Sequence, residues 1–143
     1  MKFACAAIAG TVLAAVGAVA ADEPKTQWDG VYTEAQAARG ALVYSQYCAS
    51  CHGPGLTGSE MAPALTGGEF NSNWNGLSLG DLFERIRSSM PQNNPGSLSR
   101  QQASDILAFV LQRSTFPAGE TELPTATEAL TTMKFVATKP TRQ

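Results

Sequence analysis

The sequence predicts an all-α fold with three main helices and long loops. Two segments place apolar residues at helical spacing behind a serine that can cap a helix, and an alanine-rich segment follows Thr33. Directly after the alanine-rich segment comes the run Cys48-Ala49-Ser50-Cys51-His52. The 143 residues, of which 43% are hydrophobic and 15% charged, have the composition of one globular domain.

The first helix is predicted from Glu34 to about Cys48, a stretch without proline. Thr33 and Gln36 have the spacing of a capping box at its start. Gly40 and Tyr44 are four residues apart and therefore share one helical face. Because glycine has no side chain, we expect another helix to approach closely at this face.

The segment from His52 to Asn75 is predicted to be a loop, because glycine, proline, asparagine and serine are frequent in it. A loop of this length in a small domain needs something to pack on, so we expect it to wrap a cofactor. Ser78 then caps a middle helix through about Ser89, which Pro91 ends. Its apolar positions are Leu79, Leu82, Phe83 and Ile86.

Ser99 and Gln102 predict a second capping box, which begins a last helix through about Arg113. Apolar residues between positions 106 and 111 give this helix a broad buried face. From residue 114 to 143 we expect an irregular tail that lies over the surface. Its expected anchors are Phe116, Leu123, Leu130 and Phe135.

The CxxCH run indicates covalent attachment of haem. Two thiols three positions apart can add to the two vinyl groups of one haem, and the adjacent His52 is then held where it ligates the iron. The same residues could belong to a zinc site or a redox pair. A zinc site needs four cysteine or histidine ligands, whereas the chain outside the run offers only Cys5, and a redox pair typically follows a strand. We therefore predict one haem c, bound by thioethers to Cys48 and Cys51.

The second axial ligand is not a histidine of the same chain, because His52 is the only one. Methionine, lysine, water or an open site remain. Met61 follows His52 by nine residues, too few to pass round a macrocycle, whereas Met90 ends a helix with the whole loop available before it. We predict His52 and Met90 as the iron ligands, with Met61 and Met133 filling the core.

Residues 1–21 are predicted to be a secretory signal peptide. Lys2 precedes a charge-free run from Phe3 to Ala21, which ends in small residues suited to cleavage. The alternative is a retained membrane helix, but nine of these nineteen residues are alanine, so the run is weakly apolar. We expect cleavage, a periplasmic protein without stable membrane insertion, and a mature domain of residues 22–143 with a lead-in at 22–32.

The charge of the chain excludes a nucleic-acid partner. Loss of the leader removes only Lys2 among ten basic residues, which leaves nine basic residues against twelve acidic ones. A mildly acidic protein lacks the clustered lysine and arginine that phosphates require.

The order of these features resembles class I cytochromes c, from about Trp28 to Leu123. Gly40 and Tyr44 before the haem motif are similar to the family's helix-crossing residues, and Ile106 and Phe109 to their partners. The resemblance implies a class I cytochrome c fold wrapped around one covalently bound haem.

Three further positions are similar to haem contacts of the family. The resemblance implies that the Pro63 carbonyl accepts a hydrogen bond from the ligand histidine, and that Trp74 packs at the haem edge beside a propionate. Met90-Pro91 resembles the methionine-bearing segment of bacterial members. The stretch from Trp28 through Gly40 resembles the start of cytochromes that serve periplasmic quinoprotein dehydrogenases as partners or fused domains.

The predicted function is a periplasmic electron carrier that is not an enzyme. Its haem would cycle between ferric and ferrous states with His/Met ligation. Expected partners are redox proteins, such as a quinoprotein dehydrogenase as donor and an oxidase or another cytochrome as acceptor. The alternatives are a haem c subunit held in a dehydrogenase or oxidase complex, and a haem enzyme or gas sensor with an open sixth site.

Overall fold

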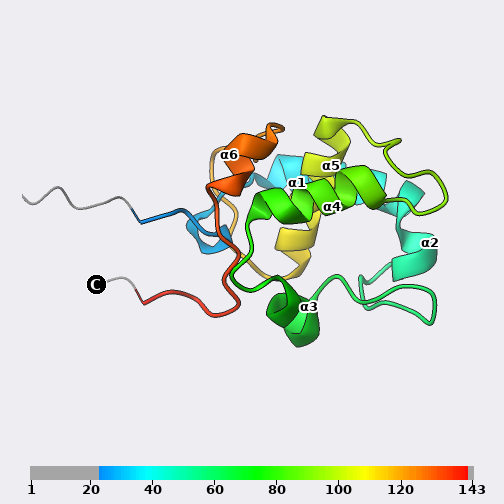
Figure 1. Ribbon diagram of the computed structural model, residues 1–143, viewed down its shortest axis with the longest axis horizontal. Coiled ribbons are helices and arrows are strands. Elements are labelled where there is room, and N and C mark those ends of the chain that lie inside the picture. The colour runs from blue at the N-terminus through cyan, green and yellow to red at the C-terminus, as the bar shows by residue number, and fades with distance from the viewer. Residues whose placement is uncertain (1–22, 142–143) are drawn as a thin grey trace, which may run out of the picture.

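The computed structural model describes residues 23–141, and over this range the fold is all-α, as predicted (Figure 1). The predicted signal peptide, residues 1–21, lies outside the described residues. Within the described range no helix has both the length and the apolar character needed to cross a bilayer. The elements are a 3₁₀ turn η1 (Gln27–Asp29) and the helices α1 (Glu34–Tyr47), α2 (Ala49–His52), α3 (Gly67–Trp74), α4 (Leu79–Ser89), α5 (Arg100–Arg113) and α6 (Thr127–Thr131).

The start of each long helix is fixed by a side chain of the preceding residue. The Ser78 hydroxyl accepts a bond from the backbone N–H of Asp81, whose carboxylate in turn accepts from the Ser78 N–H. Ser99 and Gln102 form the predicted capping box in the same way at α5. These reciprocal bonds satisfy N–H groups that a helix start leaves without partners.

The capping box predicted at α1 is only half formed. Thr33 accepts the bond from the Gln36 N–H, but the Gln36 side chain turns into the core. There its amide bonds both backbone groups of Leu123 and the hydroxyl of Ser104, at 2.8–3.1 Å. A fully buried amide needs all its partners, so these inward bonds prevail over the exposed bond at the helix start.

Helices α1 and α5 cross at Gly40, as the sequence predicts. A Cβ atom at Gly40 would lie 1.8 Å from the carbonyl oxygen of Asp105 and 3.0 Å from Cβ of Phe109. The Tyr44 ring packs on Phe109 with centroids 5.3 Å apart. Arg39 adds an ion pair across the same crossing, 3.0 Å from Asp105. The crossing therefore requires a residue without a side chain at position 40.

The long loop predicted between residues 52 and 75 contains a helix, α3, so the prediction was wrong for residues 67–74. Glycines at 67 and 68 suggest a loop, but both lie in the first turn of α3, where Gly67 has a φ of +89°, a conformation that favours glycine. Phe70 and Trp74 are four residues apart, share one face, and pack at a centroid distance of 6.2 Å.

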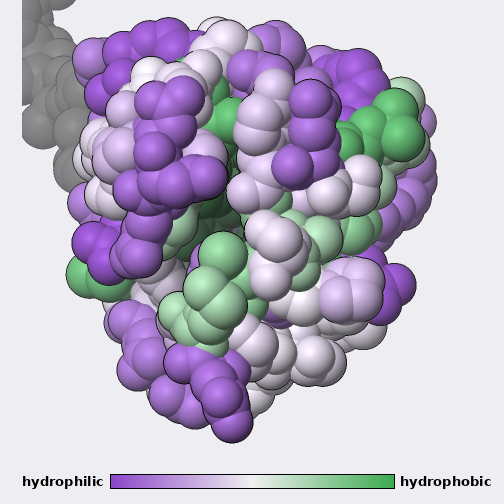
Figure 2. Space-filling view, turned by 90° about the vertical axis from the view of Figure 1, so that its right-hand side faces the viewer, coloured by the Kyte–Doolittle hydropathy of each residue, from purple (hydrophilic) through white to green (hydrophobic). Residues whose placement is uncertain are grey.

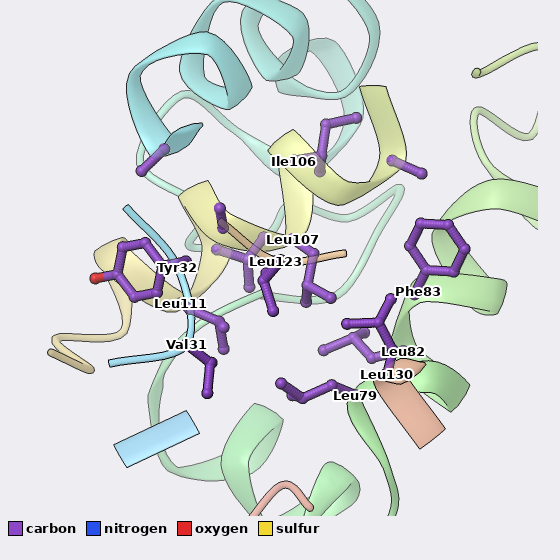
Figure 3. Packing of buried hydrophobic residues seen from close by; sticks show 14 of the residues in the cluster. Val31, Tyr32, Leu79, Leu82, Phe83, Ile106, Leu107, Leu111, Leu123 and Leu130 are labelled. Atoms are coloured by element: carbon purple, nitrogen blue, oxygen red, sulfur yellow. The ribbon is translucent and has the colours of Figure 1, made fainter. Parts of the chain in front are cut away.

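The core lies between α1, α4, α5 and the C-terminal tail (Figure 3). All four predicted tail anchors are buried, with at most 3% of their surface exposed: Phe116, Leu123, Leu130 and Phe135. The tail is not wholly irregular, because α6 forms around Leu130 and packs on α4. The tail is thus part of the core rather than a surface strap.

Candidate haem-binding site

The two thiols of the CxxCH run face the same cavity. Cys48 follows the last turn of α1, and its N–H donates to the Tyr44 carbonyl at 2.9 Å. The chain then turns into α2, where the His52 N–H donates to the Cys48 carbonyl at 3.0 Å. Because Cys48 and Cys51 are one helical turn apart, their side chains lie on one side, and both line the cavity as free thiols.

His52 is held in a single orientation. Its side chain is buried, and Nδ1 lies 2.8 Å from the carbonyl oxygen of Pro63. Since a carbonyl only accepts, Nδ1 carries the proton and Nε2 keeps the lone pair that a metal needs. This hydrogen bond also makes the imidazole a better ligand.

A tight loop brings Pro63 back to His52. The Gly58 N–H donates to the His52 carbonyl at 2.9 Å, and the Leu65 N–H donates to the Leu56 carbonyl at 2.9 Å. Gly58 has a φ of +77°, and a Cβ there would lie 2.5 Å from the backbone nitrogen of Ala64. Only glycine meets both demands, so Gly58 helps to place the Pro63 carbonyl.

The cavity beside His52 has a volume of about 660 Å³ and opens on the face shown in Figure 2, where it appears as a hollow with apolar walls. This volume lies within the range of about 300–1,000 Å³ that cofactor sites occupy. Its apolar lining includes Leu65, Phe70, Trp74, Leu82, Ile86 and Val110. Besides His52 and the two thiols, the cavity has three charged or titratable side chains, which are Glu69, Arg85 and Tyr47.

The structure brings two methionines to this cavity. Met90 caps the C-terminal end of α4 and is half-buried, and it lines the cavity together with His52. Met61 also lines it, with 78% of its surface exposed, so the expectation that Met61 fills the core was wrong. It lies in a turn closed by the bond from the Ser59 N–H to the Ala62 carbonyl, which directs it outward. Met133 packs against the core, as expected.

Burial changes the acidity of the groups around the motif. It raises the pKa of the Cys48 thiol to about 11, with the neighbouring Cys51 adding to the rise. It also raises the pKa of Tyr44 to about 12, and the Tyr44 hydroxyl donates to the Gly53 carbonyl at 2.6 Å. At neutral pH the folded chain thus holds Cys48 as a thiol and Tyr44 as a donor.

The residues at the cavity fit a haem. One imidazole nitrogen is free for iron, two thiols stand on one side for the vinyl groups, and the walls are apolar. The zinc alternative finds no support among residues 23–141, since no group of three metal-binding side chains occurs there. The structure therefore fits the haem prediction better than the zinc alternative.

Comparison with known proteins agrees with this geometry. The family model described as cytochrome c oxidase, cbb3-type, subunit III, matches residues 35–110, which is more than half of the chain. The chain belongs to this family. Its domain is thus of the cytochrome c kind, and its chemistry is electron transfer by haem c.

The fold is also similar to a solved structure, the sulfane dehydrogenase SoxCD from Paracoccus pantotrophus. The two share 21% sequence identity with a TM-score of 0.50, over 76% of this chain and 61% of that chain. At this identity the likeness shows the fold, and the chain spans less than two thirds of its counterpart. No curated protein sequence matches significantly.

Sequence reasoning missed part of the cavity wall. Glu69, Phe70 and Asn73 line it from α3, which was predicted as loop. The spacing of Phe70 and Trp74 was a usable signal for α3.

Proposed function

We propose that the chain is a periplasmic electron carrier with one haem c. In this proposal Cys48 and Cys51 hold the haem through thioethers, and His52 and Met90 are its axial ligands. Haem, when bound, supplies one-electron exchange between ferric and ferrous iron. The observation that carries the proposal is the shared cavity at which both thiols, the oriented imidazole and Met90 meet.

Four of the lining residues have a named part in the proposed function. The Pro63 carbonyl keeps the proton on Nδ1 of His52, so that Nε2 would be available to bind the haem iron. Met90 would close the sixth position, which leaves no site for a substrate, and Trp74 would cover the haem edge. The apolar walls would limit water near a bound haem, and a carrier of this kind suits small, transient interfaces with redox partners.

Export to the periplasm belongs to the same proposal. It rests on the charge-free run from Phe3 to Ala21 and its small-residue end, and on a thiol content that haem would consume. The expected check is the N-terminal sequence of the exported protein, which should begin near Asp22.

A second candidate is a cytochrome subunit held in a dehydrogenase or oxidase complex. The family description names an oxidase subunit, and this supports an assembly with a larger redox protein. A free carrier purifies as a monomer with its haem, whereas a subunit should co-purify with a larger redox protein.

The attachment is tested by mass spectrometry of denatured protein made with a haem-ligation system. The unmodified chain should keep one haem mass after denaturation. Cys48→Ser and Cys51→Ser should each retain at most one thioether, lower the holoprotein yield and move the reduced α band to longer wavelength. The control Ser50→Ala changes an exposed residue within the same run and should behave as the unmodified chain. An unmodified chain that takes up no covalent haem would overturn the proposal.

A further inference from the structure

A row of aromatic rings leads from the N-terminal lead-in to the haem cavity. Trp28 packs edge-on against Phe116 at a centroid distance of 4.7 Å, and Phe116 packs likewise on Phe135 at 5.5 Å. Phe135 continues the row to Phe70 at 6.1 Å, with Trp74 following at 6.2 Å. The first three rings lie outside the matched residues 35–110, and the last two line the cavity.

Phe135 is also fixed through its backbone to the segment that joins α3 to α4. Its N–H donates to the Leu77 carbonyl, and its carbonyl accepts from the Gly76 N–H, both at 2.8 Å. Two residues earlier in the tail, the Met133 carbonyl accepts from the Leu79 N–H at 2.9 Å. The tail is thus hydrogen-bonded to the segment that directly follows Trp74.

The lead-in holds the tail from the other side. The Lys134 N–H donates to the Lys25 carbonyl at 2.8 Å. The fully buried Gln27 exchanges two bonds with the backbone of Val136, and the indole N–H of Trp28 donates to the same carbonyl at 2.9 Å. Residues 133–136 are therefore held between the lead-in and the α3–α4 connection.

Helix α3 depends on this arrangement for its position. It has eight residues and packs extensively against none of the other described helices, and Figure 1 shows it apart from α1, α4 and α5. A helix of this length is not stable alone in water. Phe135, which is fully buried, provides the ring against which its apolar face packs.

We infer that the segments flanking the matched domain complete the haem site, with Phe135 as a positioning residue that holds Phe70 and Trp74 at the cavity wall. The inference rests on the proposed haem function. Its consequence concerns the reduction potential. If the Phe135 ring is removed, α3 loses its support and water gains access to the wall. A more polar surrounding favours the higher charge of ferric iron, so the potential falls.

The test compares ferric holoproteins carrying Phe135→Ala or Phe135→Leu with a matched control, Leu123→Ala. Leu123 is buried in the same tail, but its backbone is hydrogen-bonded to Gln36 on α1. Neither Leu123 nor Gln36 lines the cavity. The measurements are the melting temperature, the reduction potential, and the hyperfine-shifted haem methyl resonances in proton NMR spectra.

All three variants should melt at a lower temperature than the unmodified protein. Only the two Phe135 variants should also shift the haem methyl resonances, and Phe135→Ala should lower the reduction potential. Phe135→Leu retains an apolar side chain and keeps the test informative if Phe135→Ala fails to hold haem. Unchanged potential and methyl shifts in the Phe135 variants, or equal changes in Leu123→Ala, would overturn the inference. Failure of the unmodified chain to bind haem would instead overturn the proposed function.

Discussion

The close crossing of α1 and α5 gives a sharp prediction for the variant Gly40→Ala. The added Cβ would lie 1.8 Å from the Asp105 carbonyl oxygen and 2.5 Å from the carbonyl carbon. Both are backbone atoms of α5 and cannot rotate away. The helices must therefore separate until the contact reaches an ordinary length near 3.4 Å.

The magnitude follows from two opposed effects. Overpacking at a tight contact costs about 3 kcal/mol, because neighbouring groups on the same interface must move as well. Among them are the buried bond from Gln36 to Ser104 and the ion pair of Arg39 with Asp105. Alanine has a higher helix propensity than glycine, which returns about 1 kcal/mol. The free energy of unfolding should fall by about 2 kcal/mol.

Thermal unfolding of the ferric holoprotein, followed by far-ultraviolet circular dichroism, measures this loss. The melting temperature of Gly40→Ala should fall by roughly 6–10 °C. The control is Gly68→Ala, a helical glycine where an added Cβ would have no atom within 4 Å, and this variant should be neutral or slightly stabilising. If Gly40→Ala has the same melting temperature as the unmodified protein, the two helices do not cross as closely as described.

Three further predictions concern the pH dependence of stability, the turnover of peroxide and the removal of haem. Burial raises the pKa of Tyr32 from 10.0 to about 12, and the negative charge of Glu34 adds to the rise. The contribution of this phenol to the free energy of unfolding is therefore complete below pH 10 and is lost as the pH rises towards 12. In this pH range the free energy of unfolding of Tyr32→Phe, measured with urea, should therefore fall less steeply than that of the unmodified protein. Holoprotein should react rapidly with small redox mediators but turn over peroxide negligibly, since Met90 would occupy the position that peroxide needs. Fast peroxide turnover would instead favour a haem enzyme. Apoprotein should lose most of its helix content, because a cavity of about 660 Å³ would be left unfilled, and native-like circular dichroism of apoprotein would contradict this.

The sequence predicted those parts of the fold that depend on local signals. The caps at Ser78 and Ser99 act within three residues, so their spacing located α4 and α5 correctly. Thr33 and Gln36 have the same spacing, yet the competing partner of Gln36 is Leu123, which is 87 residues away along the chain. Sequence spacing carries no information about such a partner, and this is why the capping box at α1 was mispredicted.

The same distinction applies to the candidate site. The CxxCH run predicts Cys48, Cys51 and His52 as haem-binding residues because its chemistry is contained in five consecutive residues. Phe135 was recognised as an apolar anchor, but its contact with Phe70 at the cavity joins positions far apart in the chain. The long-range packing of α3 on the tail was therefore out of reach of any local pattern.

The axial ligand is the central claim, and the far-red absorption band of the ferric protein tests it most directly, because this weak band marks a methionine sulfur on ferric haem. Met61 and Met90 both line the cavity, which makes Met61→Ala a matched control for Met90→Ala. We expect Met90→Ala to abolish the band and lower the reduction potential, while Met61→Ala keeps both. Loss of the band in Met61→Ala with retention in Met90→Ala would contradict the ligand assignment.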